Sequence, residues 1–235
     1  MSIDFNYKPS DKMCNLIARN HAMLSVLTRF GISLGFREKT INEICEEQKI
    51  DCQTFLSIIN FLENQYGIER YNYKQGICMD TIIKYLKESH IYFLDYYLPL
   101  LRQNLDESLS NDAAESDFKS IVLLYFDKYV TEVRHHMQYE DKYVFTYVSN
   151  LVKGKPTGNY SIIKFAQKHN DIGLKLSELK NIIIKYYPFN SVNNKLNDTL
   201  SEIFRCEYEL AQHCKMEDYL FTPAVAELEN KLNNK

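Results

Sequence analysis

The chain has 235 residues, of which 45% are hydrophobic, and its formal net charge is −3, with acidic and basic residues mixed along its length. This length and composition allow a sizeable core, in one large domain or in a domain with a smaller partner. Glycine (7) and proline (5) are scarce, which favours long helices over a turn-rich β fold. The sequence contains no basic stripe that would indicate binding to nucleic acid. It also contains no acidic tail that would indicate a charge-driven partner.

The sequence indicates neither a targeting signal nor a disulfide framework. The N-terminal stretch lacks the basic region followed by an apolar segment that is typical of a signal peptide, so we expect none. No apolar run approaches the roughly 18 residues that a membrane span needs. The six cysteines are scattered, with no C-x-x-C pair and no zinc-finger spacing. We therefore expect a cytoplasmic protein with reduced thiols and no membrane partner.

The chain begins with the pattern of a small helical module, which we place at residues 1–65. A helix that begins near Ser10 is expected to run to about Phe30, where glycines follow. The stretch Thr40-Ile-Asn-Glu43 matches a capping box, which predicts a short helix after it. A further amphipathic segment completes the module. Short helices joined by tight turns are typical of a compact helical domain.

Long helical segments dominate the rest of the chain. Residues 66–79 contain two glycines and no clean period, so we predict a linker there. Residues 80–235 are predicted to form an all-α, up-down-up-down four-helix bundle. Pro99 and Pro223 are expected to disturb or end the first and fourth helices. The predicted helices span about 80–98, 118–152, 160–187 and 192–221.

The bundle region contains the pattern His-x-x-x-Glu twice. One copy is His136 with Glu140, and the other, much later in the chain, is His213 with Glu217. Residues four apart lie on the same face of an α-helix, one turn from each other. An imidazole and a carboxylate placed in this way can reach the same ligand, so each copy could supply half of a metal site.

A single histidine precedes each copy at nearly the same distance along the chain. His90 precedes the histidine of the first copy, and His169 precedes that of the second. Each predicted bundle helix therefore contributes one histidine, and two of them add a glutamate. The candidate metal ligands are His90, His136, Glu140, His169, His213 and Glu217.

Four imidazoles and two carboxylates could hold two metal ions, each bound by two histidines, with the glutamates bridging the pair. Iron or manganese suits this nitrogen and oxygen set, whereas a structural zinc site would more typically use cysteines. The number of ligands leaves coordination positions open. Oxygen, nitric oxide or peroxide could then bind, and redox chemistry would be accessible.

The simpler alternative is that each His-x-x-x-Glu is a solvated helix pair that adds a few tenths of a kcal/mol. The doubled register favours the metal site over this alternative. His135 has no glutamate four residues on, so we expect it to be exposed or to support a ligand. We expect the same of Asp141 and Asp218. Aromatic residues at helical spacing are usually core, so we expect packing rather than redox roles for Tyr92, Tyr139, Tyr143 and Tyr219.

The sequence over about residues 80–225 resembles the hemerythrin-like family, and more closely the RIC proteins, di-iron proteins that repair iron–sulfur clusters. The resemblance implies a non-haem centre of two iron ions with carboxylate bridges, held by the six candidate ligands. It also implies defence against nitrosative or oxidative damage, with damaged iron–sulfur proteins as partners. The residues that carry it are Ser89-His90, Leu98-Pro99, His136-Met-Gln-Tyr-Glu140-Asp141, Phe145, Lys168-His169, His213-Cys-Lys-Met-Glu217-Asp218 and Pro223.

The N-terminal module resembles the small helical domain that precedes the bundle in RIC proteins, through Arg29-Phe-Gly31-Ile32 and Lys39-Thr-Ile-Asn-Glu-Ile-Cys45. The adjacent cysteine pair of those proteins is replaced by Ser33-Leu34-Gly35-Phe36. Cluster repair is therefore one hypothesis. The others are a non-enzymatic binder or sensor of oxygen or nitric oxide, and a purely structural helical bundle.

Overall fold

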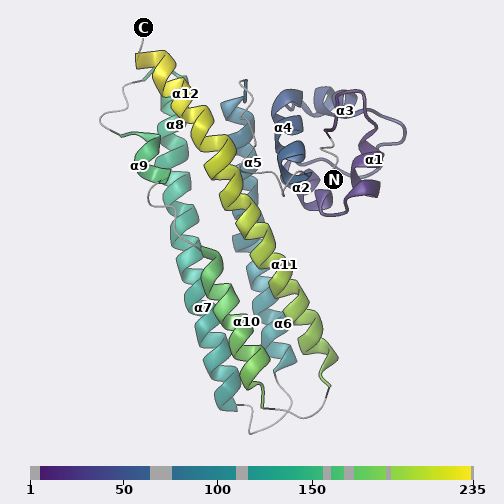
Figure 1. Ribbon diagram of the computed structural model, residues 1–235, viewed down its shortest axis with the longest axis vertical. Helices are drawn as coiled ribbons and strands as arrows, with labels where there is room; N and C mark the ends of the chain where they lie inside the picture. Colours follow the sequence, from purple (N-terminus) through teal and green to yellow (C-terminus); the bar gives the residue numbers. More distant parts are fainter. Residues whose placement is uncertain are drawn as a thin grey trace, which may run out of the picture. The chain divides into compact units, whose positions relative to one another are not determined.

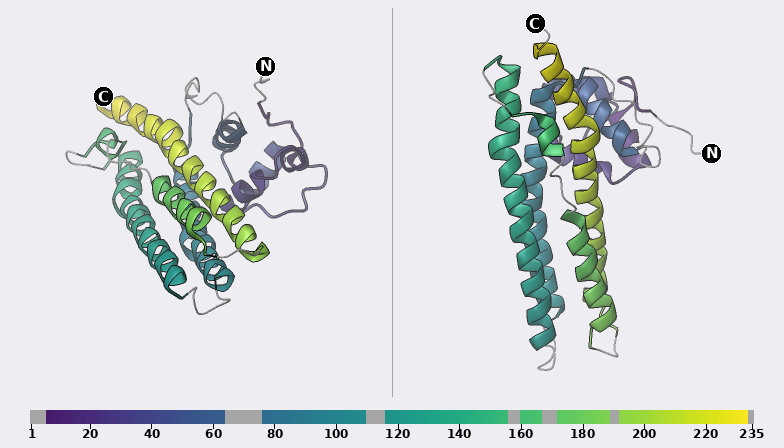
Figure 2. Two further views of the ribbon diagram at one scale, coloured as in Figure 1. Left: turned by 60° about the horizontal axis from the view of Figure 1, so that its bottom comes forward. Right: turned by 60° about the vertical axis from the view of Figure 1, so that its left-hand side comes forward.

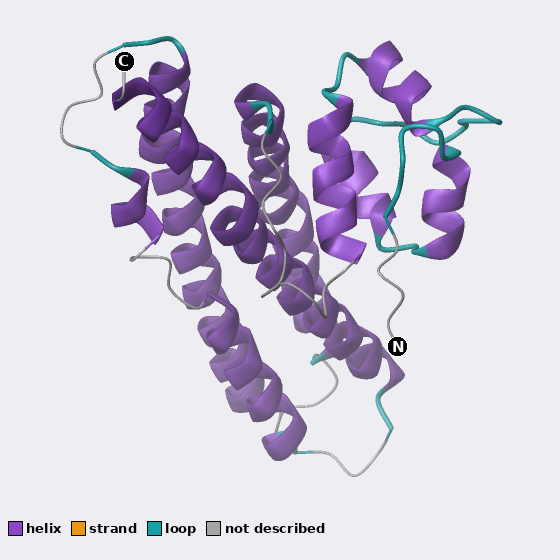
Figure 3. Ribbon diagram, turned by 45° about the horizontal axis from the view of Figure 1, so that its top comes forward, coloured by secondary structure: helices purple, strands orange, loops and turns teal. Residues whose placement is uncertain are grey.

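A computed structural model describes residues 6–63, 76–109, 116–155, 160–166, 172–188 and 192–233. Over these ranges the secondary structure is helical, and no strand is present beyond an isolated antiparallel β-bridge between Lys12 and Thr40 (Figure 3). The predicted all-α class is therefore confirmed. Among the described helices, none is both long and apolar enough to cross a membrane.

The chain forms two compact units. Unit 1 consists of Met1–Ser89, Tyr143–Lys168 and Lys215–Lys235, and unit 2 of His90–Lys142 and His169–Cys214. The predicted domain boundaries, with a module at 1–65 and a bundle at 80–235, stay a prediction. Most of the predicted linker, residues 66–75 of 66–79, lies outside the described residues.

Unit 2 is a four-helix bundle. Consecutive helices run in opposite directions, and the two further views agree with this (Figures 1 and 2). Helix α7 packs against both α6 and α10, and apolar side chains from all four helices share one core, for example Leu101, Phe126, Leu179 and Ile203. The predicted up-down-up-down topology is confirmed in this unit. Its helices are η2 (Tyr92–Tyr97) with α6 (Leu98–Ser108), α7 (Ser116–Tyr139), α10 (Ile172–Tyr186) and α11 (Asn194–Met216).

Three long helices contain a π-helical segment. The first runs from α5 (Met79–Ile91) through η2 into α6, the second from α7 through η4 (Glu140–Val144) into α8 (Phe145–Val152), and the third from α11 through η5 (Glu217–Phe221) into α12 (Thr222–Asn233). In such a segment each N–H donates to the carbonyl five residues back. Leu98 donates in this way to Phe93, and Thr222 to Glu217. π-helical segments are rare, and many lie at functional sites.

Neither Pro99 nor Pro223 ends its helix, so the first bundle helix is longer than predicted. Each proline is the second residue after a π-helical segment. The change from i→i−5 to i→i−4 bonding already interrupts the backbone ladder there, so the missing proline N–H leaves little further disruption. With the extra turns of α6, His90 and His136 each lie about five helical turns from the connection between α6 and α7. The two histidines therefore reach similar levels in the bundle.

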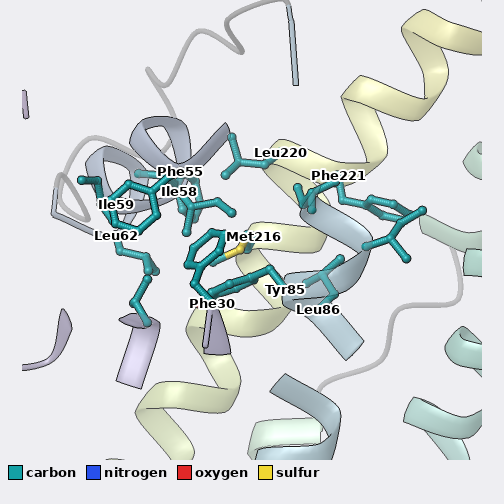
Figure 4. Close-up of a cluster of buried hydrophobic side chains, with 14 of the residues drawn as sticks. Phe30, Phe55, Ile58, Ile59, Leu62, Tyr85, Leu86, Met216, Leu220 and Phe221 are labelled. Carbon is teal, nitrogen blue, oxygen red and sulfur yellow. The ribbon is translucent and has the colours of Figure 1, made fainter. Parts of the chain in front are cut away.

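Unit 1 joins the N-terminal helices to segments from much later in the chain. Phe30 packs against Phe55 of α4 and Tyr85 of α5, with ring centroids 5.0 and 4.8 Å apart (Figure 4). Met216 and Phe221 belong to the same buried cluster. The N-terminal module therefore shares its core with α5 and η5. Its own helices are α1 (Met13–Arg19), α2 (Met23–Arg29), α3 (Ile41–Gln48) and α4 (Cys52–Glu63), and unit 1 also contains α9 (Ile162–Ala166).

Two local predictions for the N-terminal module, a long first helix and a capping box, have different outcomes. The single helix predicted from Ser10 to Phe30 was wrong, because Asn20 is extended and its side chain accepts the N–H of Ala22, which separates α1 from α2. The capping box is confirmed. The Thr40 hydroxyl accepts the Glu43 N–H at 3.2 Å, and the Glu43 carboxylate accepts the Thr40 N–H at 2.7 Å. The hydrogen bonds that the Glu43 carboxylate accepts from the Thr40 N–H and from the Thr40 hydroxyl lower the pKa of Glu43.

Phe30→Ala is expected to lower the free energy of unfolding by about 3–5 kcal/mol, because it removes a buried ring that contacts two others. Chemical denaturation followed by far-UV circular dichroism measures the loss. Leu34→Ala is the control, because Leu34 is 68% exposed and its loss should stay within about 0.5 kcal/mol. Equal losses for the two variants would contradict the shared core.

Candidate metal centre

Three of the candidate ligands converge in unit 2. His90 lies near the end of α5, Glu140 is the first residue of η4, and His213 lies in the last turn of α11. The Nε2 atom of His90 is 3.2 Å from Nε2 of His213 and 3.3 Å from Oε2 of Glu140. All three side chains are buried. Three helices far apart in the sequence thus deliver two imidazoles and a carboxylate to one point.

Glu217 follows His213 on the same continuous helix, one turn further on, and is fully buried. One of its carboxylate oxygens lies within 4.8 Å of a ring nitrogen of His213. His90, Glu140, His213 and Glu217 form a group whose ligand atoms could hold a metal ion, and we call it the His/Glu cluster.

His136 adjoins the cluster through Glu140. Its Nε2 atom lies 2.9 Å from Oε1 of Glu140, and its side chain is 19% exposed. The two oxygens of Glu140 therefore face different imidazoles, Oε1 toward His136 and Oε2 toward His90. A carboxylate that presents one oxygen to each of two imidazoles has the arrangement that a bridge between two metal ions requires.

The remaining histidine of the predicted set is not placed: His169 lies outside the described residues. His135, the neighbour of His136, is exposed, as expected from its lack of a paired glutamate. Five of the six predicted ligands are thus described. Four of them form the His/Glu cluster, and His136 contacts it.

Asp141 has a more specific place than the sequence indicated. Its Oδ1 atom lies 3.1 Å from Nδ1 of His90, and its side chain is 39% exposed. A carboxylate on Nδ1 fixes the orientation of the ring and directs Nε2 toward the cluster. The adjacent Glu-Asp pair was visible in the sequence, but its contact with a histidine on another helix was not. Asp218, its counterpart after Glu217, is exposed.

The π-helical segments coincide with the cluster. Segments η4 and η5 begin at Glu140 and Glu217, and η2 begins two residues after His90. Side chains at such a junction take directions that a regular α-helix does not offer. Sequence reasoning missed these segments, because a change in hydrogen bonding over a single turn does not alter the apolar pattern enough to be seen.

The chemistry of the donor set fits a metal ion. Ligand atoms bound at about 2.1 Å to one octahedral ion lie about 3 Å apart, close to the separations between His90, His213 and Glu140. Burial of two glutamates is costly unless the charges are paired or coordinate a metal. Two buried carboxylates beside buried imidazoles are therefore an arrangement that a cation stabilises.

Comparison with known proteins identifies the family. A family model of the hemerythrin HHE cation-binding domain matches residues 81–225, which include the whole His/Glu cluster. No curated protein and no solved structure matches the chain. The matched region covers more than half of the chain, and the cluster within it suits metal binding. The chain therefore belongs to the hemerythrin HHE cation-binding family.

Proposed function

We propose that this chain is a non-haem di-iron protein related to the RIC proteins, and that it acts on damaged iron–sulfur proteins under nitrosative or oxidative stress. The observation that carries the proposal is the convergence of His90, Glu140 and His213 in a buried site. The membership of the hemerythrin HHE family supports it. The resemblance to RIC proteins noted in the sequence supplies the choice of iron over manganese.

In this proposal His90, His136, Glu140, His169, His213 and Glu217 would hold two iron ions. Glu140, whose two oxygens face separate imidazoles, would contribute its carboxylate to both ions. Glu217, the glutamate of the second His-x-x-x-Glu copy, would do the same. The ions would supply open coordination positions and one-electron chemistry for oxygen, nitric oxide or peroxide.

The protein's own residues hold and shield this site. Asp141 orients His90 by its contact with Nδ1. Phe93 packs edge-on against His213, with ring centroids 6.0 Å apart. Such apolar neighbours keep bulk water away from the ligands, which strengthens every electrostatic interaction among them.

A second candidate is a non-enzymatic binder or sensor of oxygen or nitric oxide. The thiols of Cys45 and Cys52 in the N-terminal module favour this binding function over repair. Burial raises the pKa of Cys45 far above its ordinary value, and burial also raises the pKa of Cys52. A thiol that stays protonated is a poor nucleophile. Cys45 and Cys52 are therefore poor candidates for the reactive thiol that a cysteine-dependent repair step would use.

The double substitution Glu140→Ala with Glu217→Ala should abolish the bound iron pair, because it removes both bridges, while the helix content stays largely intact. Iron is measured after anaerobic loading and desalting, and helix content by circular dichroism. His135→Ala, which changes an exposed histidine beside His136, serves as the control and should keep its iron. Iron content equal to that of the unaltered protein would refute the ligand assignment.

Asp141→Asn should weaken metal binding by about 10- to 100-fold, because the partner that orients the His90 ring loses its charge. Competition with a chelator of known affinity gives the dissociation constant. Asp218→Asn is the matched control, since Asp218 follows the other glutamate and is exposed. Equal affinities of the two variants would show that the contact with His90 does not support the site.

Repair and binding can be separated with the iron-loaded protein. Repair predicts that an iron–sulfur enzyme inactivated by peroxide recovers activity when the loaded protein is added, and that the Glu140→Ala, Glu217→Ala variant has no such effect. Binding predicts no recovery, together with a reversible change of the visible spectrum on adding and removing nitric oxide. Recovery that matches the activity obtained with free ferrous iron alone would contradict the repair function.

A further inference from the structure

Four aromatic side chains of η2 extend from His213 toward solvent, and we call them the aromatic column: Phe93, Tyr92, Tyr97 and Tyr96. The ring centroid of Phe93 lies 6.0 Å from that of His213, and the centroid of Tyr92 lies 5.4 Å from that of Phe93. Tyr92 in turn lies 5.4 Å from Tyr97 and 5.7 Å from Tyr96. The column belongs entirely to unit 2.

The π-helical backbone builds this column. In a regular α-helix a residue five positions further on is turned by about 140° from the first, because one turn takes about 3.6 residues. The wider turn of a π-helix places residues four and five positions on beside the first residue. Tyr96 and Tyr97 can therefore both pack against Tyr92. An α-helical backbone would leave only one of them there.

Tyr97 has a proton acceptor of its own. Its hydroxyl donates to Oε2 of Glu202 at 2.9 Å and approaches the backbone oxygen of that residue at 3.2 Å. Its side chain is buried, and burial and the carboxylate raise the pKa of Tyr97 well above its ordinary value. Tyr97 therefore remains protonated at neutral pH. It can lose an electron readily only if its proton leaves in the same step, and Glu202 is in position to take it.

We propose that Tyr97 is a redox-active residue that delivers an electron to the metal centre through Tyr92, Phe93 and His213. The inference rests on the proposed function, because the centre must hold a redox metal. When hydrogen peroxide oxidises the centre, the O–H bond of Tyr97 breaks, the proton passes to Glu202 and the electron passes along the column. Tyr97 becomes a neutral tyrosyl radical.

The electrons and protons balance. Hydrogen peroxide takes up two electrons and two protons to form two molecules of water. One electron comes from the metal centre and one from Tyr97. The Tyr97 proton passes to Glu202, whose side chain is 40% exposed and can release it to solvent, and the two protons that peroxide takes up come from solvent. Tyr96 is 60% exposed at the solvent end of the column, so a soluble one-electron reductant can return the electron there.

Tyr125, which also lies in unit 2, is a matched control for Tyr97. The Tyr125 hydroxyl also donates to a carboxylate, that of Glu178, and burial raises the pKa of Tyr125 to about 12. Tyr125 is not part of the aromatic column. It therefore has the same hydrogen-bond chemistry as Tyr97 without the chain of rings that leads to His213.

The test uses the full-length, iron-loaded protein, reduced anaerobically, mixed with hydrogen peroxide and freeze-quenched for electron paramagnetic resonance. We expect an organic radical signal that narrows when the protein contains ring-deuterated tyrosine. Tyr97→Phe should abolish this signal and Tyr125→Phe should leave it unchanged. Glu202→Gln keeps a hydrogen-bond acceptor but cannot take the proton, so it should reduce the radical yield. A purely structural role of Glu202 would leave the yield unchanged.

Failure of this inference and failure of the proposed function give different results. Iron content and visible absorption are measured on each sample before peroxide is added. A protein without iron overturns the di-iron proposal. An iron-loaded protein that consumes peroxide but forms no tyrosyl radical, or forms it equally in Tyr97→Phe, overturns the role of Tyr97. Circular dichroism shows whether Tyr97→Phe is folded, and Tyr92→Phe, which should lower the yield without touching the Glu202 hydrogen bond, tests the same route independently.

Discussion

The buried carboxylate of Glu140 is the constraint on which the site depends. It lies between the imidazoles of His90 and His136, with one oxygen directed to each. A carboxylate removed from water is costly, and partners that stay in register on two different helices must offset the cost. The bundle core of unit 2 keeps these helices in register. The packing of apolar side chains and the placement of the candidate ligands therefore depend on the same register between helices. A shift of one helix along its neighbour would disturb both.

The pattern His-x-x-x-Glu was enough to point to two of the helices that carry the candidate ligands, because residues four apart share a helix face whatever the partner helix is. It was not enough to show how the helices continue. Pro99 and Pro223 predicted that each helix would be disturbed or would end, since a proline inside a regular α-helix removes a hydrogen bond. The π-helical segments before them change that expectation, and nothing in the side-chain sequence distinguishes i→i−5 from i→i−4 bonding over a single turn. The same limitation hid the column of Tyr92, Tyr96 and Tyr97.

Contacts between residues far apart in the chain are the second kind of feature that the sequence predicts only in part. The doubled spacing of histidines led to His90 and His213, and the structure brings their Nε2 atoms to 3.2 Å. Asp141 beside His90 depends on the exact rotation of two helices, which the apolar period does not fix. In the N-terminal module the apolar period ran on through Asn20, whose side-chain hydrogen bond breaks the helix. Local polar groups can compete with the helix in this way wherever they reach a backbone N–H.

The distribution of oxidisable side chains differs between the two units. In unit 1 the thiols of Cys45 and Cys52 are held protonated by burial, which makes them slow to react with oxidants. In unit 2 the tyrosines of η2 stand in contact with one another and with the Phe93 ring beside His213. Tyrosine oxidation does not need a preformed anion when a carboxylate such as Glu202 accepts the proton. The aromatic contacts that lead toward the candidate metal centre therefore belong to the bundle, whereas Cys45 and Cys52 contribute to the packing of the core that the N-terminal module shares with α5.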